Sequence, residues 1–129
     1  MIAVDTNLLV RILTNDDPNQ ARRAVKILES DDIFIPKTVL LETEWVLRHA
    51  YEIKRSNIII GFQKLIGLPN VRVEDPDSIY QAISWYENKF DFADALHVAS
   101  SIRCKSFATF DNLLIKKAQQ FSSMEMVNP

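Results

Sequence analysis

The first thirteen residues, MIAVDTNLLVRIL, decide how the rest of the chain is interpreted. The apolar residues 2–4 end at Asp5-Thr6-Asn7, and residues 8–13 then have the composition of a helix. A short apolar run followed by a polar turn and a helix is typical of a strand in an α/β protein. The opening stretch therefore predicts a first strand with polar residues directly after it.

The same alternation of short strands and helices continues along the chain. Further strands are expected at residues 33–35, 71–73, 106–110 and 124–127. Helices are expected from Pro18, over residues 38–51, from Ser56 or Asn57 to Gly67, and over residues 76–88, 92–103 and 112–120. Strands that alternate with helices pair in parallel through crossovers. We therefore expect an α/β fold with three layers, in which helices flank a central parallel sheet of four to five strands.

Length and composition fit one folded domain spanning residues 1–129. Hydrophobic residues make up 47% and charged residues 25% of the chain, which excludes a disordered or low-complexity protein. The net charge of −2 argues against a protein that coats nucleic acid through many phosphate contacts. The single Cys104 cannot form an internal disulfide, and no apolar run approaches the roughly 18 residues of a membrane span. These features predict a cytoplasmic protein that does not enter a membrane.

Acidic residues stand where a parallel sheet binds its ligands, at the carboxyl ends of the strands. Asp5 follows the first expected strand, Asp111 follows the fourth, and Asp91 and Asp94 begin a helix expected at the same edge. Neighbouring carboxylates raise one another's pKa unless a cation neutralises them. Magnesium prefers such oxygen ligands and can assist phosphodiester hydrolysis. The pattern predicts metal-assisted hydrolysis of a phosphodiester.

Each of these acids also has a purely structural interpretation. Asp5, Asp91 and Asp111 all precede helices and could act as N-caps. Glu42 and Glu44 lie at opposite edges of the apolar arc of one helix, so its periodicity does not choose between them.

Four ordered motifs resemble the PIN-domain family, and most closely its VapC-type ribonuclease toxins of type II toxin–antitoxin modules. The motifs are Val4-Asp5-Thr6-Asn7, residues 38–42 ending in Glu42, residues 91–96 with Asp91 and Asp94, and Thr109-Phe110-Asp111. The resemblance covers essentially the whole chain. It implies a PIN-like fold and an endoribonuclease, dependent on Mg²⁺ or Mn²⁺, that hydrolyses RNA with metal-activated water.

Position by position, the resemblance also implies which residues form the site. The catalytic and metal-binding acids would be Asp5, Glu42, Asp94 and Asp111, which selects Glu42 over Glu44. The residues that support these acids would be Thr6, Asn7, Thr109 and Asp91. Asp91 matches less strictly, because the family pattern admits other residues there.

The resemblance further implies a homodimer, a cognate antitoxin protein, and an RNA substrate with a structured or single-stranded loop. Basic residues around an acidic site could guide an RNA backbone, although a charge run is more often a solvated face. The candidates for such an RNA rim are Arg22, Arg23, Lys26 and Arg48. Two further expectations concern packing: Cys104 as a buried thiol on a helix, and Trp45 and Trp85 in the core or at a subunit contact.

Two alternatives remain open at this point. A haloacid-dehalogenase-like phosphatase would use Asp5 as its nucleophile, but it also needs an acidic pair after a late strand. The pairs Asp16-Asp17 and Asp31-Asp32 do not follow one. The other alternative is a catalytically inactive PIN-like module that only binds a partner.

Overall fold

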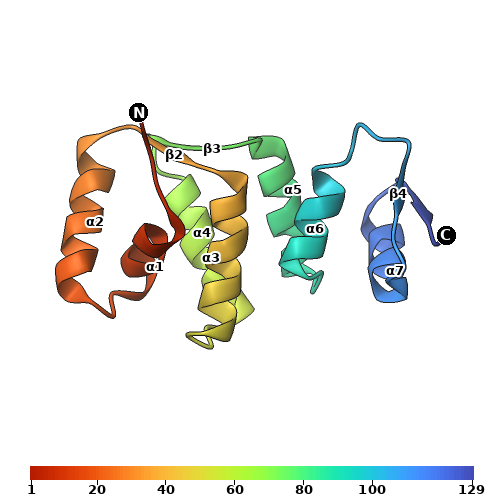
Figure 1. Cartoon of the computed structure of the whole chain (residues 1–129), viewed down its shortest axis with the longest axis horizontal. Coiled ribbons are helices and arrows are strands. Elements are labelled where there is room, and N and C mark those ends of the chain that lie inside the picture. The colour runs from red at the N-terminus through yellow and green to blue at the C-terminus, as the bar shows by residue number, and fades with distance from the viewer. The chain divides into compact units, whose positions relative to one another are not determined.

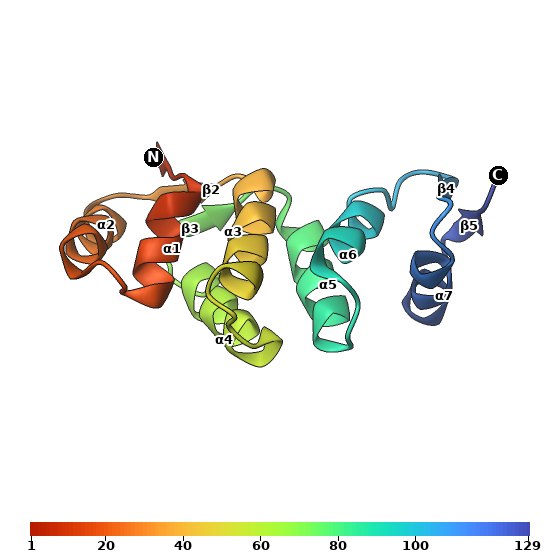
Figure 2. The same cartoon turned by 60° about the horizontal axis from the view of Figure 1, so that its bottom comes forward.

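The computed structural model describes all residues, 1–129. The chain divides into two compact units, Met1–Pro76 and Asp77–Pro129, and each is described by itself. Figures 1 and 2 draw the elements of both units in two orientations. The organisation of residues 1–129 as one domain stays a prediction.

The first unit contains a three-stranded parallel sheet with the strand order β1-β2-β3. Ile2 lies opposite Ile33, and Ile33 lies opposite Val71. Parallel neighbours need long connections, which are helical here (Figure 1). The elements are β1 (Ile2–Ala3), α1 (Thr6–Thr14), α2 (Pro18–Ser30), β2 (Ile33–Ile35), α3 (Lys37–His49), α4 (Arg55–Ile66) and β3 (Val71–Val73).

Helix α1 is held in place by two other helices of the first unit. Helix α1 contacts both α2 and α3, and its Leu9 is fully buried together with Leu40 of α3 and Phe62 of α4. Helix α2 begins with Pro18 in its first turn, where proline fits best, and Asp17 Oδ1 accepts a hydrogen bond from Gln20 N at 3.1 Å. This packing fixes the direction in which α1 leaves β1.

Polar contacts fix the turn between α1 and α2. Arg11 donates hydrogen bonds to Asp16 Oδ1 at 2.9 Å, to Gln20 Oε1 at 2.7 Å and to Tyr51 Oη at 3.1 Å. Tyr51, which follows α3, donates its hydroxyl to Asp16 Oδ2 at 2.6 Å. The hydrogen bond from Tyr51 is the main cause that holds the pKa of Asp16 below its usual value of 3.8, and Thr14 and Arg11 lower it further.

This lowered pKa makes the stability of the chain depend on pH. The depressed pKa means that Asp16 contributes stability above the unfolded-state pKa of 3.8, and that this contribution is lost as the pH falls through the folded-state pKa. We expect wild type to be more stable than Asp16→Asn at neutral pH, and the difference to shrink below about pH 4. Urea unfolding of both proteins, from neutral pH to below about pH 4, measures this difference in the free energy of unfolding. Tyr51→Phe should lose part of the same pH-dependent stability. A difference in stability between wild type and Asp16→Asn that stays constant with pH would contradict this role of Asp16.

The second unit contains a two-stranded parallel sheet formed by β4 and β5, with Phe107 opposite Met126. Helix α7 connects the two strands (Figure 2). Phe92 is fully buried at the start of α6 and meets Tyr86 edge to face, with ring centroids 5.2 Å apart. The elements are α5 (Pro76–Glu87), α6 (Phe92–Ala99), β4 (Ser106–Ala108), α7 (Asn112–Phe121) and β5 (Glu125–Val127).

The α/β class and the parallel pairing predicted from the sequence are confirmed. All five strands are present, and they form one parallel sheet in each unit. No helix is long and apolar enough to cross a membrane.

Helix α6 ends at Ala99, four residues earlier than predicted. Ser101 Oγ donates to His97 O at 2.8 Å, and Cys104 N donates to Ser101 O at 2.9 Å, so this segment turns instead of continuing the helix. Cys104 is therefore exposed, and its prediction as a buried thiol was wrong. Trp85 is buried as expected, whereas Trp45 is 57% exposed.

Candidate functional site

In the first unit, Thr6 connects two of the predicted site acids. Asp5 caps α1 two residues after the end of β1, and its Oδ1 accepts a hydrogen bond from Thr6 N at 2.7 Å. The side chain of the same threonine donates from Oγ1 to Glu42 Oε1 at 2.5 Å. Thr6 is buried, whereas both carboxylates are exposed. The buried threonine thus holds Asp5 of α1 and Glu42 of α3 near each other.

In the second unit, Asp91, Asp94 and Asp111 are close enough to interact electrostatically. Asp91 caps α6 through a hydrogen bond from Asp94 N to its Oδ2 at 3.1 Å. Asp111 caps α7, and its Oδ1 accepts from Leu113 N at 3.0 Å and from Leu114 N at 3.1 Å. The structural interpretation of these residues as N-caps is confirmed. Capping engages one oxygen of Asp111 and leaves its Oδ2 without a described hydrogen bond.

Asp94 has the most strongly perturbed environment of the predicted acids. Its carboxylate is half-buried and accepts no described hydrogen bond. Burial raises the pKa of Asp94, the carboxylates of Asp91 and Asp111 raise it further, and His97 lowers it. A carboxyl group with such surroundings is a candidate functional residue.

The remaining predicted residues have different surroundings. Thr109 Oγ1 accepts from Asp111 N at 3.0 Å, and Thr109 N donates to Val127 O at 2.9 Å, so this threonine orients Asp111 from the end of β4. Asn7 is exposed in the first turn of α1. Arg22, Arg23 and Lys26 are exposed on α2. Within neither unit do three His, Cys, Asp or Glu side chains gather into a group that could hold a metal ion.

Glu44 and Arg48, by contrast, form an ion pair along α3. The side chain of Glu44 is only 1% exposed, and its Oε2 accepts from Arg48 Nε at 2.7 Å. Arg48, a predicted residue of the RNA rim, therefore binds a buried carboxylate of its own helix. The two glutamates of α3 therefore differ in burial and in partner, because Glu42 is exposed and accepts a hydrogen bond from Thr6.

The ion pair predicts a stability effect that can be measured without RNA. Arg48→Met should destabilise the chain by about 2 to 3 kcal/mol, because it removes the cation beside the buried Glu44. The double variant Glu44→Gln/Arg48→Met should lose less than the single variant, since the buried charge is gone as well. Urea unfolding compares the two, with Arg22→Met as an exposed control. A single variant as stable as wild type would contradict this role of Arg48.

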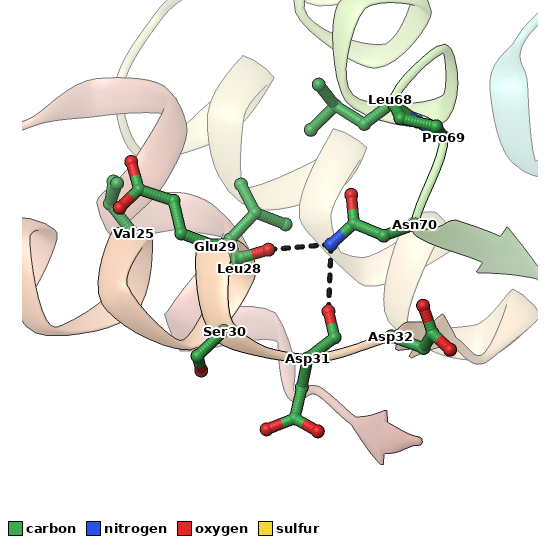
Figure 3. A pocket seen from close by; sticks show the side chains of 9 residues that line it. All are labelled: Val25, Leu28, Glu29, Ser30, Asp31, Asp32, Leu68, Pro69 and Asn70. Atoms are coloured by element: carbon green, nitrogen blue, oxygen red, sulfur yellow. Dashed lines mark hydrogen bonds between the residues drawn. The ribbon is translucent and has the colours of Figure 1, made fainter.

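The surface of the first unit is hollowed near the start of β3 and between α1 and α2. The first hollow has a volume of about 710 Å³ and lies at the amino ends of β2 and β3, between residues 25–32 and 68–70 (Figure 3). There Asn70 Nδ2 donates to Leu28 O at 2.7 Å and to Asp31 O at 2.8 Å, which ties the end of α2 to the start of β3. This hollow is at the edge of the sheet opposite to Asp5, because Asp5 follows the carboxyl end of β1.

The second hollow is a groove of about 550 Å³ between α1 and α2, and it includes Asn7. Sequence reasoning missed the contributions of Arg11 and Gln20 to this groove. A signal was present, because Arg11 lies four residues after Asn7 and Gln20 lies three residues before Arg23, spacings that share one helix face.

Comparison with known protein families gives a match to the PIN domain over residues 2–119. The chain belongs to the PIN domain family. The match covers parts of both units and each of the motifs from Asp5 to Asp111. PIN domains are generally nucleases and typically use divalent metal ions, so membership indicates a nuclease-like function and favours it over a phosphatase that uses Asp5 as a nucleophile. No curated protein matches this PIN domain chain.

Proposed function

We propose that this PIN domain is an endoribonuclease, dependent on Mg²⁺ or Mn²⁺, with Asp5, Glu42, Asp94 and Asp111 as its catalytic and metal-binding acids. The observation that carries the proposal is the half-buried Asp94 carboxylate, which accepts no described hydrogen bond although Asp91 and Asp111 lie close by. The family match supports it, because one PIN domain model spans the motifs of both units. The proposal thus treats residues 1–129 as one PIN domain.

The donor set suits a hard divalent cation. All four acids offer carboxylate oxygens, the ligands that magnesium prefers, and no cysteine or histidine is needed. Neither Asp5 Oδ2 nor Asp111 Oδ2 takes part in a described hydrogen bond. A bound ion would polarise the scissile phosphate and supply an activated water.

The other site residues would orient these acids. Thr6 holds Asp5 through its backbone N–H and Glu42 through its hydroxyl, and Thr109 accepts from the backbone of Asp111. Asp91 fixes the first turn of α6, from which Asp94 projects. Asn7 would be a further supporting residue, two positions after Asp5 in the first turn of α1.

We infer a biological role from the resemblance to VapC-type toxins. In this role the chain is a cytoplasmic toxin that forms a homodimer, is neutralised by a cognate antitoxin protein, and cleaves a structured or single-stranded loop in RNA. Guidance of RNA by Arg22, Arg23 and Lys26 stays a prediction, supported by their exposed positions on α2.

The direct test is cleavage of end-labelled structured RNAs by the purified chain. Cleavage should require Mg²⁺ or Mn²⁺, stop with EDTA and leave 5′-phosphate and 3′-hydroxyl ends. Glu42→Gln, purified in the same way, controls for contaminating ribonucleases and should be inactive. Cleavage that persists in EDTA, or that Glu42→Gln retains in full, would contradict the proposal.

A further inference from the structure

The groove between α1 and α2 is lined by basic, polar and apolar side chains. Its lining contains no acidic residue and consists of Asn7, Leu8, Arg11, Gln20, Arg23, Ala24 and Ile27. The apolar members can contact uncharged parts of a ligand. Arg11 already pairs with Asp16, so the groove's attraction for an anion comes mainly from Arg23, for which no ion pair is described. The lining therefore selects for a ligand that is negatively charged and partly apolar.

Arg11 is held in place before any ligand binds. Its Nε donates to Gln20 and its Nη1 to Asp16 and Tyr51, so the side chain is tied to the α1–α2 turn and to the end of α3. Its Nη2 takes part in no described hydrogen bond. A guanidinium fixed in this way loses little conformational freedom when it binds a further anion.

Arg23 supplies a cation without a carboxylate partner. It is exposed on α2, and no ion pair or hydrogen bond of its side chain is described. Arginine binds phosphate oxygens through two parallel N–H groups, which makes a free guanidinium in a groove well suited to a phosphodiester.

Asn7 connects this groove to the acidic residues. It lines the groove, and it lies two residues after Asp5 in the first turn of α1. A strand whose phosphate lies at Asp5 can therefore continue directly into the groove.

We propose that the α1–α2 groove binds a backbone phosphate of single-stranded RNA next to the cleavage site, with Arg23 as its main ligand and Arg11 as a fixed second donor. This rests on the proposed function, because the RNA is the substrate assigned there. It deepens that function by naming where the strand runs.

Binding is tested in EDTA, where no cleavage is expected, by fluorescence anisotropy of a labelled 12-nucleotide single-stranded RNA. Arg23→Ala should weaken binding about fivefold, the effect of losing one exposed charge contact. It should also reduce the slope of log K against log salt by about 0.7, the value for one phosphate contact on a single strand. Arg72→Ala is the matched control, because Arg72 is exposed on β3 of the same unit and does not line the groove.

The outcomes separate this proposal from the proposed function. Equal effects of Arg23→Ala and Arg72→Ala on affinity and salt slope would overturn the groove assignment, even if the chain cleaves RNA. Conversely, a specific effect of Arg23→Ala in a chain that cleaves no RNA would support the groove and contradict the nuclease. A labelled polyglutamate peptide tests the other anionic class, and the assignment is overturned if Arg23→Ala weakens peptide binding but leaves RNA binding unchanged.

Discussion

Asp94→Asn should reduce metal-dependent RNA cleavage by at least about a thousandfold, because losing a direct metal ligand removes several kcal/mol of transition-state stabilisation. The substitution keeps the size of the side chain and removes its negative charge. Asp94 accepts no described hydrogen bond, and its N–H bond to Asp91 belongs to the backbone, so the fold should persist. Initial rates of cleavage at saturating Mg²⁺ measure the effect, and circular dichroism checks that the variant is folded.

Asp77→Asn is the matched control for this experiment. Asp77 is an exposed aspartate in the first turn of α5, in the same unit as Asp94. The control should retain wild-type activity. If both variants cleave RNA as wild type does, Asp94 is not a metal ligand.

Phe92→Ala should destabilise the chain by about 3 to 5 kcal/mol, the usual loss when a fully buried phenylalanine is truncated. Its ring is 0% exposed and packs edge to face on Tyr86 of α5, which contributes to the fold beyond the burial of area. Phe92 is also the first residue of α6, two positions before Asp94. The variant should therefore lose activity together with stability. Urea unfolding, followed by tryptophan fluorescence, measures the loss in the free energy of unfolding.

Two further substitutions test whether packing is the cause. Phe92→Leu should lose less than the alanine variant, because it leaves a smaller cavity. Ile102→Ala removes an apolar side chain that is 68% exposed and should change stability by less than about 0.5 kcal/mol. A small effect of Phe92→Ala, similar to that of Ile102→Ala, would contradict the packing described for α6.

Local signals predicted most of the secondary structure because they act over a few residues. Pro18 marks the start of α2, Asp91 caps α6, and Asp111 caps α7, as their positions in the sequence indicate. The prediction failed at the end of α6, where a side chain competes with the backbone for a hydrogen bond. Ser101 bonds to His97 O and helps to end α6 early, which no apolar periodicity reveals.

The candidate site was predictable in its residue types but not in its contacts. The helical periodicity did not distinguish Glu42 from Glu44, but their partners in the structure do. Glu42 accepts a hydrogen bond from Thr6, which is distant in the sequence, whereas Glu44 pairs with Arg48 one turn further along the same helix. The α1–α2 groove depends on the tertiary contact of two helices, so the sequence indicated its basic residues only as a charge cluster on α2. A single sequence does not reveal which residues from different helices and strands come into contact.

Binding of Mn²⁺ tests the proposed metal dependence of Asp5 and Asp94 most directly, without relying on any RNA. Electron paramagnetic resonance measures free Mn²⁺ during titration of wild type, Asp5→Asn, Asp94→Asn and the control Asp77→Asn. We expect wild type and Asp77→Asn to bind Mn²⁺ equally, and Asp5→Asn and Asp94→Asn each to weaken binding by at least about tenfold, the effect of one lost carboxylate ligand. Unchanged Mn²⁺ affinity in either Asp5→Asn or Asp94→Asn would contradict the account.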